Sequence, residues 1–570
     1  MVDAGAVVDL LKDARERRTA PLILELDLTD GIVEGPPADP VSALVSMRRA
    51  HLRDVLAGLR KGGSDPRVKA LIVRIGGGRL GLAVAQELRA AVQAFRDAGK
   101  LTVAWAESFG ETGRGTVPYY LATAFERIYL QPSGDLALTG VALEEPFFNE
   151  ALEKAGITPR FAKRHEYKTA ANTFMERTYT PEHREMSDRI VSSIGAQVVA
   201  GVAAGRGLPE ERVRELIDQA PLLGPEALEA GLVDRLAYRD EVYAEVRAAA
   251  GGVRGGEVRL RYVARYNRGQ NVTKRIPRPQ QDVVALIQGH GPIRLGRSGR
   301  GLLPGQGASI GSDTIAAAFR AAARDDKVKA IVFRVDSPGG SYVASDTIWR
   351  EVVLARKAGK PVIVSMGNVA ASGGYFVAAP ADTIVAQPGT LTGSIGVVIG
   401  KPVIGDLLDR LGIGLGSVEH GAHARMYAPT RDFTDEEWSR INTFLDRVYD
   451  DFVGKVAEGR AMSRERVHEL ARGRVWTGAD AHERGLVDEL GGLAYALDLA
   501  RKKAGLAADA PVRAYPRVSP LDRLRPAESS DDRTAASARV DAWGPLTGVA
   551  TRIGLPSGGP LMLPGAWEIR

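Results

Sequence analysis

The sequence contains no cysteine among its 570 residues, which excludes disulfides, thiol catalysis and thiolate metal sites. Long apolar runs are also missing: no segment approaches the roughly 18 uninterrupted apolar residues that predict a membrane-spanning helix. Net charge is low at +6, and the basic residues are dispersed, so a nucleic-acid partner is not indicated. The remaining composition, 44% hydrophobic and 26% charged, is typical of a globular protein, and the length predicts two or more domains.

The N-terminal 31 residues carry a charged amphipathic opening and then a short apolar run that Glu25 and Asp27 interrupt. Neither a secretory apolar core nor a cleavage signal is present in this stretch. We therefore expect a cytoplasmic protein, and peripheral association with a membrane stays open.

Much of the chain occurs twice. DPRVKALIVRIGGG, which begins at Asp65, returns as DDKVKAIVFRVDSPGG from Asp325. YYLATAFERIYLQP from Tyr119 matches YFVAAPADTIVAQP from Tyr375, and a further pair of matching segments begins at Glu211 and at Glu465. A period above 200 residues is far too long for a solenoid, so the repeat indicates duplication of a large domain.

Each copy alternates β-rich runs with helical patterns, as in LIVRI, AVAQELRAAVQAFRDAG and LTVAWA of the first copy. This alternation predicts an α/β fold with parallel strand pairing. Prolines and charges interrupt the pattern near residues 271–282, and the composition shifts to Pro, Ser, Gly and Arg after about residue 510. We expect domains at residues 1–270 and 271–510, followed by a flexible extension at 511–570 whose apolar end, GPLMLPGAWEIR, is suited to docking.

The two copies differ at one chemically informative place. The second has NVAASGGY around Ser372, between a predicted strand and a short predicted helix, whereas the first has Thr116, Val117 and Pro118 at the matching position. A small hydroxyl on such a turn can cap the helix, or it can be an exposed nucleophile. Because proline removes an N–H donor and changes the turn, only the second copy keeps the features of a serine site.

A serine nucleophile needs a neighbouring base, and the sequence leaves more than one candidate. His420 and His423 follow Ser372, so a Ser-His-Asp arrangement stays open, although neither histidine has a recognisable motif around it. The first copy offers FAKRHEYKTAANTF with Lys163 and Lys168. A lysine buried against apolar walls has a depressed pKa and can act as a general base, whereas a solvated lysine cannot.

Four motifs taken together resemble one family. DSPGG at residues 336–340, NVAASGGY, TGSIGV at residues 392–397 and the YKTA of the first copy are similar to the long, internally duplicated form of the signal peptide peptidase A family, S49. The resemblance covers residues 20–505. It implies two tandem ClpP/crotonase-like domains of ββα-type units, and a serine-lysine dyad that cuts remnant signal peptides and other unfolded peptides.

The resemblance also implies a role for each matching residue. Ser372 corresponds to the nucleophile, Lys168 to the general base, and Ser394 to the hydroxyl that holds the lysine amine. The N–H groups around Gly339, Gly340 and Gly373 correspond to the oxyanion hole. The family further implies a homo-oligomer, for which we expect a tetramer, and it implies no cofactor or metal.

Two departures from the family pattern stand out. The lysine motif reads YKTAANTF, where the family has a Pro and a Glu, and we expect this protein to lack the N-terminal membrane anchor that long bacterial members usually carry. Two other functions remain as alternatives: a crotonase-type acyl-CoA enzyme, which would share the fold but uses no serine nucleophile, and a non-catalytic oligomeric scaffold, since one copy has already lost the serine motif.

Overall fold

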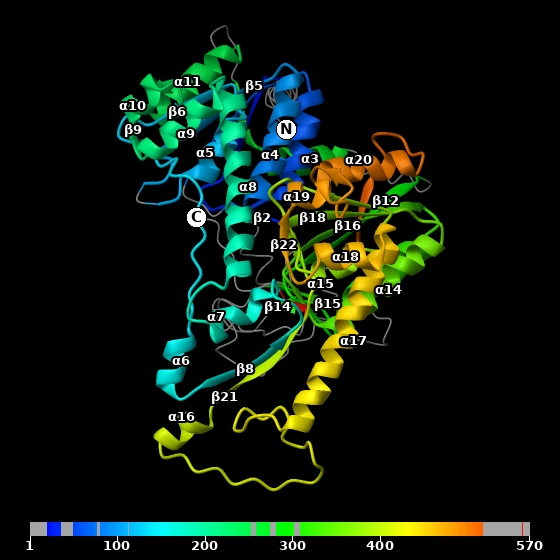
Figure 1. Cartoon of the computed structure of the whole chain (residues 1–570). Coiled ribbons are helices and arrows are strands. Elements are labelled where there is room, and N and C mark those ends of the chain that lie inside the picture. Colours follow the sequence, from blue (N-terminus) through cyan, green and yellow to red (C-terminus); the bar gives the residue numbers. More distant parts are fainter. Residues whose placement is uncertain are drawn as a thin grey trace, which may run out of the picture. The chain divides into compact units, whose positions relative to one another are not determined.

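A computed structural model describes residues 20–35, 49–76, 80–111, 113–251, 258–273, 281–300, 308–516 and 561–562 (Figure 1). These residues form two compact units. Unit 1 comprises Met1–Glu34, Leu44–Val141 and Gly195–Pro279, and unit 2 comprises Gly35–Ala43, Ala142–Ile194 and Gln280–Arg570. Residues 142–194 of the first sequence copy thus belong to unit 2.

The predicted domain boundaries at residues 270 and 510 remain predictions. The two units are interleaved along the chain, so they do not correspond one to one with the predicted domains. Most of the join at 271–282 and most of the predicted extension at 511–570 lie outside the described residues.

Unit 1 is built on a six-stranded sheet whose neighbouring strands are all parallel. In spatial order it contains β10 (Arg235–Leu236), β6 (Arg127–Leu130), β5 (Leu101–Ala106), β4 (Val68–Arg74), β1 (Leu22–Asp27) and β11 (Arg259–Tyr262). Consecutive residues of β4 from Ala70 to Val73 are all buried, so both faces of the sheet are covered. Runs of this kind are typical of parallel sheets with helices on both sides.

Unit 2 repeats this strand order. Its central path contains β23 (Glu489–Leu490), β19 (Thr383–Ala386), β18 (Val362–Ala371), β16 (Val328–Ser337), β12 (Val283–His290) and β24 (Val512–Tyr515). Every neighbouring pair on this path is parallel. Further along β18, β20 (Leu391–Gly393) pairs in parallel and is itself joined antiparallel to β22 (Val475–Thr477). In unit 1, β7 (Asp135–Leu136) and β9 (Leu222–Leu223) form the matching antiparallel pair. The shared order is what the internal repeat predicts.

Helices connect the strands of both units, and the α/β prediction is confirmed. Unit 1 contains α3 (Leu52–Ser64), α4 (Leu82–Asp97), α5 (Thr116–Ala122), α9 (Glu210–Gln219), α10 (Gly224–Glu229), α11 (Arg239–Ala249) and α12 (Val263–Thr273). Unit 2 contains α6 (Asn149–Ala155), α7 (Asn172–Met175), α13 (Ser312–Arg324), α14 (Tyr342–Lys357), α15 (Gly373–Ala378), α16 (Gly405–Arg410), α17 (Asp435–Arg460), α18 (Arg464–Leu470), α19 (Gly478–Glu483) and α20 (Leu493–Lys503). Helix α8 (Pro181–Arg206) carries residues of both units.

Two smaller sheets of unit 2 extend from its central sheet. One is an antiparallel ribbon of β8 (Thr158–Lys163) and β21 (Val398–Val403). The other, in spatial order, contains β14 (Gly299–Arg300), β15 (Ala308–Gly311), β13 (Ile293–Arg294), β17 (Gly339–Gly340) and β25 (Leu561–Met562). The first two strands of unit 1 outside its main sheet, β2 (Ile32–Val33) and β3 (Ala50–His51), pair with each other in parallel.

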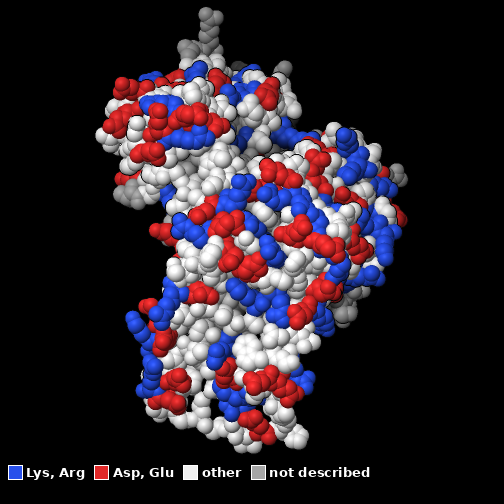
Figure 2. Space-filling model, in the orientation of Figure 1, with Lys and Arg blue, Asp and Glu red and all other residues white. Residues whose placement is uncertain are grey.

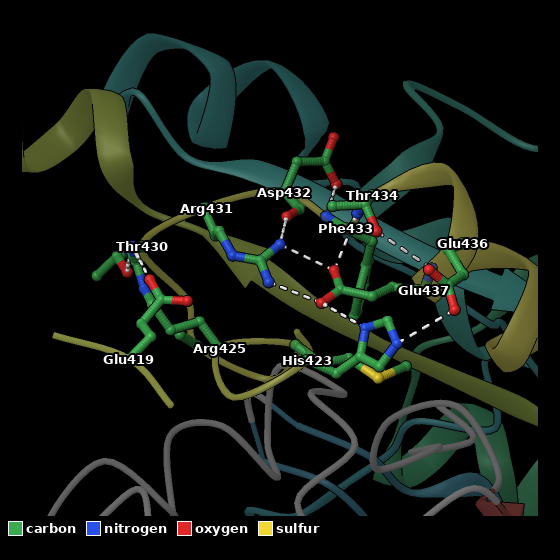
Figure 3. Close-up of polar contacts among 12 residues, drawn as sticks. Glu419, His423, Arg425, Thr430, Arg431, Asp432, Phe433, Thr434, Glu436 and Glu437 are labelled. Carbon is green, nitrogen blue, oxygen red and sulfur yellow. Dashed lines mark hydrogen bonds and ion pairs between the residues drawn. The ribbon is translucent and has the colours of Figure 1, made fainter. Parts of the chain in front are cut away.

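A polar cluster fixes the start of α17 (Figure 3). The Thr434 hydroxyl accepts the Glu437 N–H at 3.2 Å, and the Glu437 carboxylate accepts the Thr434 N–H at 2.9 Å, which together form a capping box. Arg431 donates to both carboxylate oxygens of Glu437, at 2.7 and 2.8 Å. These bonds lower the pKa of the buried Glu437 carboxyl to about 2, with the hydrogen bonds from Arg431 as the largest cause.

No single helix among the described residues is long and apolar enough to cross a membrane. One pair, α8 and α9, meets the length and composition criteria only jointly, across a bend of 110°. On the face drawn in Figure 2, basic and acidic side chains are interspersed over most of the surface. That face therefore offers no broad basic area for a polyanion.

Candidate active site

Ser372 lies at the turn between β18 and α15, as the sequence predicts for the strand and the short helix around it. Its backbone has φ +54° and ψ −115°, an unfavourable conformation for a residue with a side chain. The Ser372 N–H donates to the Gly393 carbonyl at 2.8 Å, and its carbonyl accepts the Phe376 N–H at 2.9 Å. Neighbouring strand β20 and helix α15 therefore hold this strained turn in place.

Packing of α15 keeps the turn rigid. The Tyr375 hydroxyl donates to the Leu486 carbonyl at 2.8 Å, and the Phe376 ring lies 4.9 Å from the ring of Phe452 in α17. Both aromatic residues of α15 are buried. Because α15 packs in the hydrophobic core of unit 2, the position of a nucleophile at its N-terminal end is fixed.

Lys168 meets Ser372 inside the same compact unit. Its amine nitrogen Nζ lies 3.0 Å from Ser372 Oγ, 3.0 Å from Ser394 Oγ and 3.2 Å from the Ser394 carbonyl oxygen. A neutral amine has two N–H donors and one lone pair, so it can donate twice to Ser394 and accept the Ser372 hydroxyl proton. The structure thus brings together the three residues that the resemblance implies as catalytic.

Burial sets the electrostatics of this amine. Lys168 is fully buried, and desolvation lowers its pKa from the usual 10.5 to about 7. The described contacts of Nζ are hydroxyls and a carbonyl, so the ammonium form gains no carboxylate partner there. A substantial fraction of the amine is therefore neutral near pH 7, as a general base requires.

Two glycines that sequence reasoning did not single out enclose the lysine side chain. A Cβ on Gly473 would lie 2.4 Å from the backbone nitrogen of Lys168 and 2.5 Å from its Cα. A Cβ on Gly396 would lie 3.2 Å from Cδ of the Lys168 side chain. Gly473 also has φ +88°, and its N–H donates to the Ile395 carbonyl at 2.8 Å. Gly396 lies within the TGSIGV motif, which offered a sequence signal, but Gly473 has no motif around it.

A polar brace holds the loop that carries Lys168. The Tyr167 hydroxyl donates to Glu185 at 3.0 Å, and Arg474 donates to both Glu185 oxygens, at 2.5 and 2.8 Å. The Arg474 guanidinium also lies over the Tyr167 ring, 4.7 Å from its centroid. Glu185 belongs to α8, so that helix fixes the loop from one side. Only Tyr167 of these three residues stood in a recognised motif.

The three predicted oxyanion-hole glycines lie together beside Ser372. Gly339 and Gly340 form β17, and a Cβ on Gly373 would meet the Gly340 nitrogen at 3.1 Å and Gly339 Cα at 3.2 Å. Gly339 has φ +101° and Gly340 φ +152°, conformations that favour glycine. The Gly339 N–H donates to the Ser337 hydroxyl at 3.1 Å, so it reaches a substrate carbonyl only by leaving or sharing that bond.

The other candidate bases lie elsewhere. Lys163 Nζ donates to Asn172 Oδ1 at 2.6 Å. His423 lies in the polar cluster at the start of α17, where its Nε2 is 3.3 Å from Glu436 (Figure 3).

In unit 1, the Thr116 hydroxyl donates to the Gly140 carbonyl at 2.9 Å. The matching position of the first copy therefore has its hydroxyl committed to a backbone carbonyl.

Comparison with known proteins agrees with the sequence motifs. The profile of "Peptidase family S49" matches residues 94–252 and 354–507, one segment in each copy of the repeat. A structure of a membrane-bound stomatin-specific protease is 17% identical over 41% of this chain, with a TM-score of 0.26.

Curated relatives match over most of the chain. The chloroplastic serine protease SPPA of Arabidopsis thaliana is 32% identical over 447 residues, which make up 78% of this chain and 64% of that protein. Protease 4 of Haemophilus influenzae is 30% identical over 82% of this chain and 75% of its own length. Protease 4 of Salmonella typhi is 33% identical over 72% of this chain, and the match spans 66% of that protein. With both halves matched by one family profile, the chain belongs to peptidase family S49.

Proposed function

We propose that this chain is a serine endopeptidase that cleaves peptide bonds with a Ser372-Lys168 dyad. The observation that carries the proposal is the 3.0 Å contact between Lys168 Nζ and Ser372 Oγ, with the amine buried and its pKa lowered to about 7. A crotonase-type enzyme needs no such nucleophile and base pair, and a scaffold needs neither a strained serine nor a desolvated lysine.

The reaction follows from these contacts. Neutral Lys168 accepts the hydroxyl proton as Ser372 Oγ attacks the carbonyl carbon of the scissile bond. The N–H groups of Gly340 and Gly373 stabilise the resulting oxyanion, joined by that of Gly339 when it leaves the Ser337 hydroxyl, and each donor is worth about 3 kcal/mol by analogy with other oxyanion holes. The Lys168 ammonium then protonates the leaving amine. Water hydrolyses the acyl-enzyme, with Lys168 again taking and returning a proton.

Ser394 holds the lysine amine in this scheme. Its hydroxyl and carbonyl oxygen receive the two N–H groups of the neutral amine, which directs the lone pair at Ser372. The ordered amine then needs no rearrangement before proton transfer.

The substrates we propose are remnant signal peptides and other unfolded peptides. We also propose that the two units are tandem ClpP/crotonase-like domains that arose by duplication. Three of the relatives reported above are named as proteases, and the repeated strand order supports the duplication. An extended peptide fits a site whose wall consists of glycines and alanines, because these residues leave room for a backbone beside Ser372.

We also propose self-association, with a tetramer as the expected form and peripheral membrane contact as an accompanying property. The segment between α16 and α17 exposes several apolar side chains: Leu411, Ile413, Leu415, Val418 and Tyr427. Contiguous exposed apolar side chains are typical of interaction surfaces. Sedimentation of the wild type and of Val418→Asp measures whether the assembly depends on this segment.

Covalent labelling tests the proposed chemistry directly. A fluorophosphonate should modify Ser372 in the wild type and leave Ser372→Ala unlabelled, as peptide mapping by mass spectrometry would show. Digestion of a peptide library should fall by several orders of magnitude in Ser372→Ala. The substitution replaces one small buried residue with another, so the melting temperature should change little. An unlabelled serine in a folded, peptide-free sample, or near-wild-type digestion by Ser372→Ala, would reject the proposal.

A further inference from the structure

Two residues near the C-terminus, Leu561 and Met562, lie beside the candidate active site. Strand β25 consists of Leu561 and Met562, and it pairs antiparallel with β17, so that Gly339 is opposite Met562 and Gly340 is opposite Leu561. Leu561 is fully buried and Met562 is 6% exposed. The strand that it joins is the one that carries two of the three proposed oxyanion-hole glycines.

The position of the Leu561 carbonyl matters most. A Cβ on Gly339 would lie 2.1 Å from the Leu561 carbonyl oxygen and 2.7 Å from the Gly373 nitrogen. The Leu561 carbonyl oxygen and the Gly373 amide therefore lie on the same side of Gly339. Gly373 is the residue that directly follows Ser372 in the chain. A peptide substrate attacked by Ser372 has to bring its own scissile carbonyl oxygen toward the same N–H group.

Strand addition explains why the site can hold such a segment. β17 pairs with β13 on one side, which leaves its other edge for an added strand. An extended peptide gains main-chain hydrogen bonds by adding to a sheet edge, and pockets for its side chains supply selectivity. Because β17 is two glycines, no side chain blocks the approaching backbone.

We propose that the segment containing Leu561 and Met562 binds in cis as a substrate-like ligand and competes with peptides for the β17 edge. This inference rests on the proposed function and specifies its substrate class: an extended, uncharged peptide with an aliphatic residue whose carbonyl faces the Gly373 N–H. A tethered ligand has an effective concentration in the millimolar range, so it suppresses the binding of a dilute peptide.

The test uses the full-length chain with Ser372→Ala, in which cleavage cannot occur, and a fluorescent peptide with the sequence GPLMLP of residues 559–564. Fluorescence anisotropy measures its affinity. Adding Leu561→Asp should strengthen peptide binding about tenfold or more, because a buried, unpaired carboxylate releases the tethered segment and frees the edge. Met562→Asp should act in the same direction. Leu223→Asp, the same change at a leucine of unit 1 that is 63% exposed, is the matched control and should leave the affinity unchanged.

Equal peptide affinity with and without Leu561→Asp and Met562→Asp would overturn the inference, as would failure of GPLMLP to bind any variant. A GPDMLP peptide that binds as well as GPLMLP would contradict the proposed aliphatic selectivity. Fluorophosphonate labelling of Ser372 in the Leu561→Asp chain, whose site the tethered segment no longer occupies, separates this failure from failure of the proposed function. Labelling together with unchanged affinity rejects only the cis ligand. Absent labelling together with stronger peptide binding rejects the serine chemistry and keeps the peptide-binding edge.

Discussion

At the scale of single residues, the site depends on a lysine amine kept neutral by burial instead of by a charged neighbour. Ion pairing would raise the pKa of Lys168 and remove the lone pair that Ser372 needs, whereas desolvation lowers this pKa to about 7. Surrounding the amine with two serines satisfies its N–H groups without adding charge. Burial of an amine without a charged partner costs folding free energy because its ammonium form is desolvated, so this arrangement is one that function explains better than stability does.

The pH dependence of activity follows from that amine. Only the unprotonated form accepts the serine proton, so kcat/KM should rise about tenfold per pH unit below pH 7 and level off above it. Arginine cannot deprotonate in this range, so Lys168→Arg should be inactive from pH 5 to 9. Initial rates with a fluorogenic peptide measure both. Lys360→Arg is the matched control: Lys360 donates to two backbone carbonyls away from Ser372, and its variant should retain activity.

Substantial activity in Lys168→Arg would contradict the dyad. So would an inactive His423→Ala variant, since that histidine contacts Glu436 and has no role in the proposed chemistry.

Gly473 offers a sharper residue-level test, because it touches the lysine without taking part in chemistry. In Gly473→Ala the new Cβ would overlap the Lys168 backbone, with atoms 2.4 and 2.5 Å away, and displace the amine. Misplacing a catalytic group by about 1 Å costs on the order of 10²-fold in rate. Gly359→Ala is the control: its φ of +76° imposes a similar backbone penalty, but a Cβ there meets nothing within 4 Å.

The measurement is kcat/KM beside the thermal midpoint. Gly473→Ala should lose activity well beyond any loss in Gly359→Ala when both are assayed well below their midpoints, and its midpoint should fall further because its Cβ meets backbone atoms. Equal activities in the two variants would show that Gly473 does not position the lysine.

At the scale of secondary-structure elements, the capping cluster of α17 predicts acid sensitivity. The pKa of Glu437 is lowered in the folded protein, so its contribution to stability is present above pH about 4.5 and is lost as pH falls toward 2. Glu437→Gln should lower the thermal midpoint at pH 7, and its difference from the wild type should shrink at pH 3. Calorimetry or circular dichroism melts measure this.

Glu436→Gln is the matched control at the adjacent residue. Glu436 is 64% exposed and pairs with Arg440 on the same helix, an arrangement that contributes little to stability. Its midpoint should stay near that of the wild type at both pH values. A Glu437→Gln difference that grew on acidification would have the wrong sign for a carboxylate stabilised in the fold.

The same scale shows how far sequence reasoning reached. Periodicity predicted β18 and α15 around Ser372, and the repeat predicted matching sheets, because both follow from local patterns of apolar residues. The site residues Ser372, Lys168 and Ser394 were named through motifs. Gly473 and Arg474 were missed because their importance lies in contacts with Lys168 and with Glu185 respectively, about 300 positions away in the sequence, and no local pattern records such contacts.

The sequence predicted that the apolar C-terminal segment docks on a surface, but it did not predict that Leu561 and Met562 pair with β17. The apolar composition of GPLMLPGAWEIR predicted that it binds a surface, but strand addition is made through backbone atoms that every residue has. Composition therefore indicates that such a segment docks and leaves its destination undetermined.

At the scale of the whole molecule, both residues of the proposed dyad come from one chain, although they belong to different copies of the repeat. Residues 142–194, which include Lys168, cluster with the unit that contains Ser372 and Ser394. After duplication, each copy can lose the residue that the other supplies. The loss of the serine motif at Thr116 in the first copy fits this history.

An intrachain site makes a definite prediction for mixed assemblies. Chains with Ser372→Ala and chains with Lys168→Ala are co-expressed with different affinity tags and purified sequentially, so that only mixed oligomers remain. If every dyad forms within one chain, as the 3.0 Å contact indicates, each dyad in the mixture lacks one member and peptidase activity stays at the level of either single variant. Mixed oligomers of wild type and Ser372→Ala are the control, and should keep activity in proportion to their wild-type chains. Recovery of a sizeable fraction of that activity by the two defective chains would mean that serine and lysine meet across a subunit interface. The dyad chemistry would then stand, and the intrachain site would be wrong.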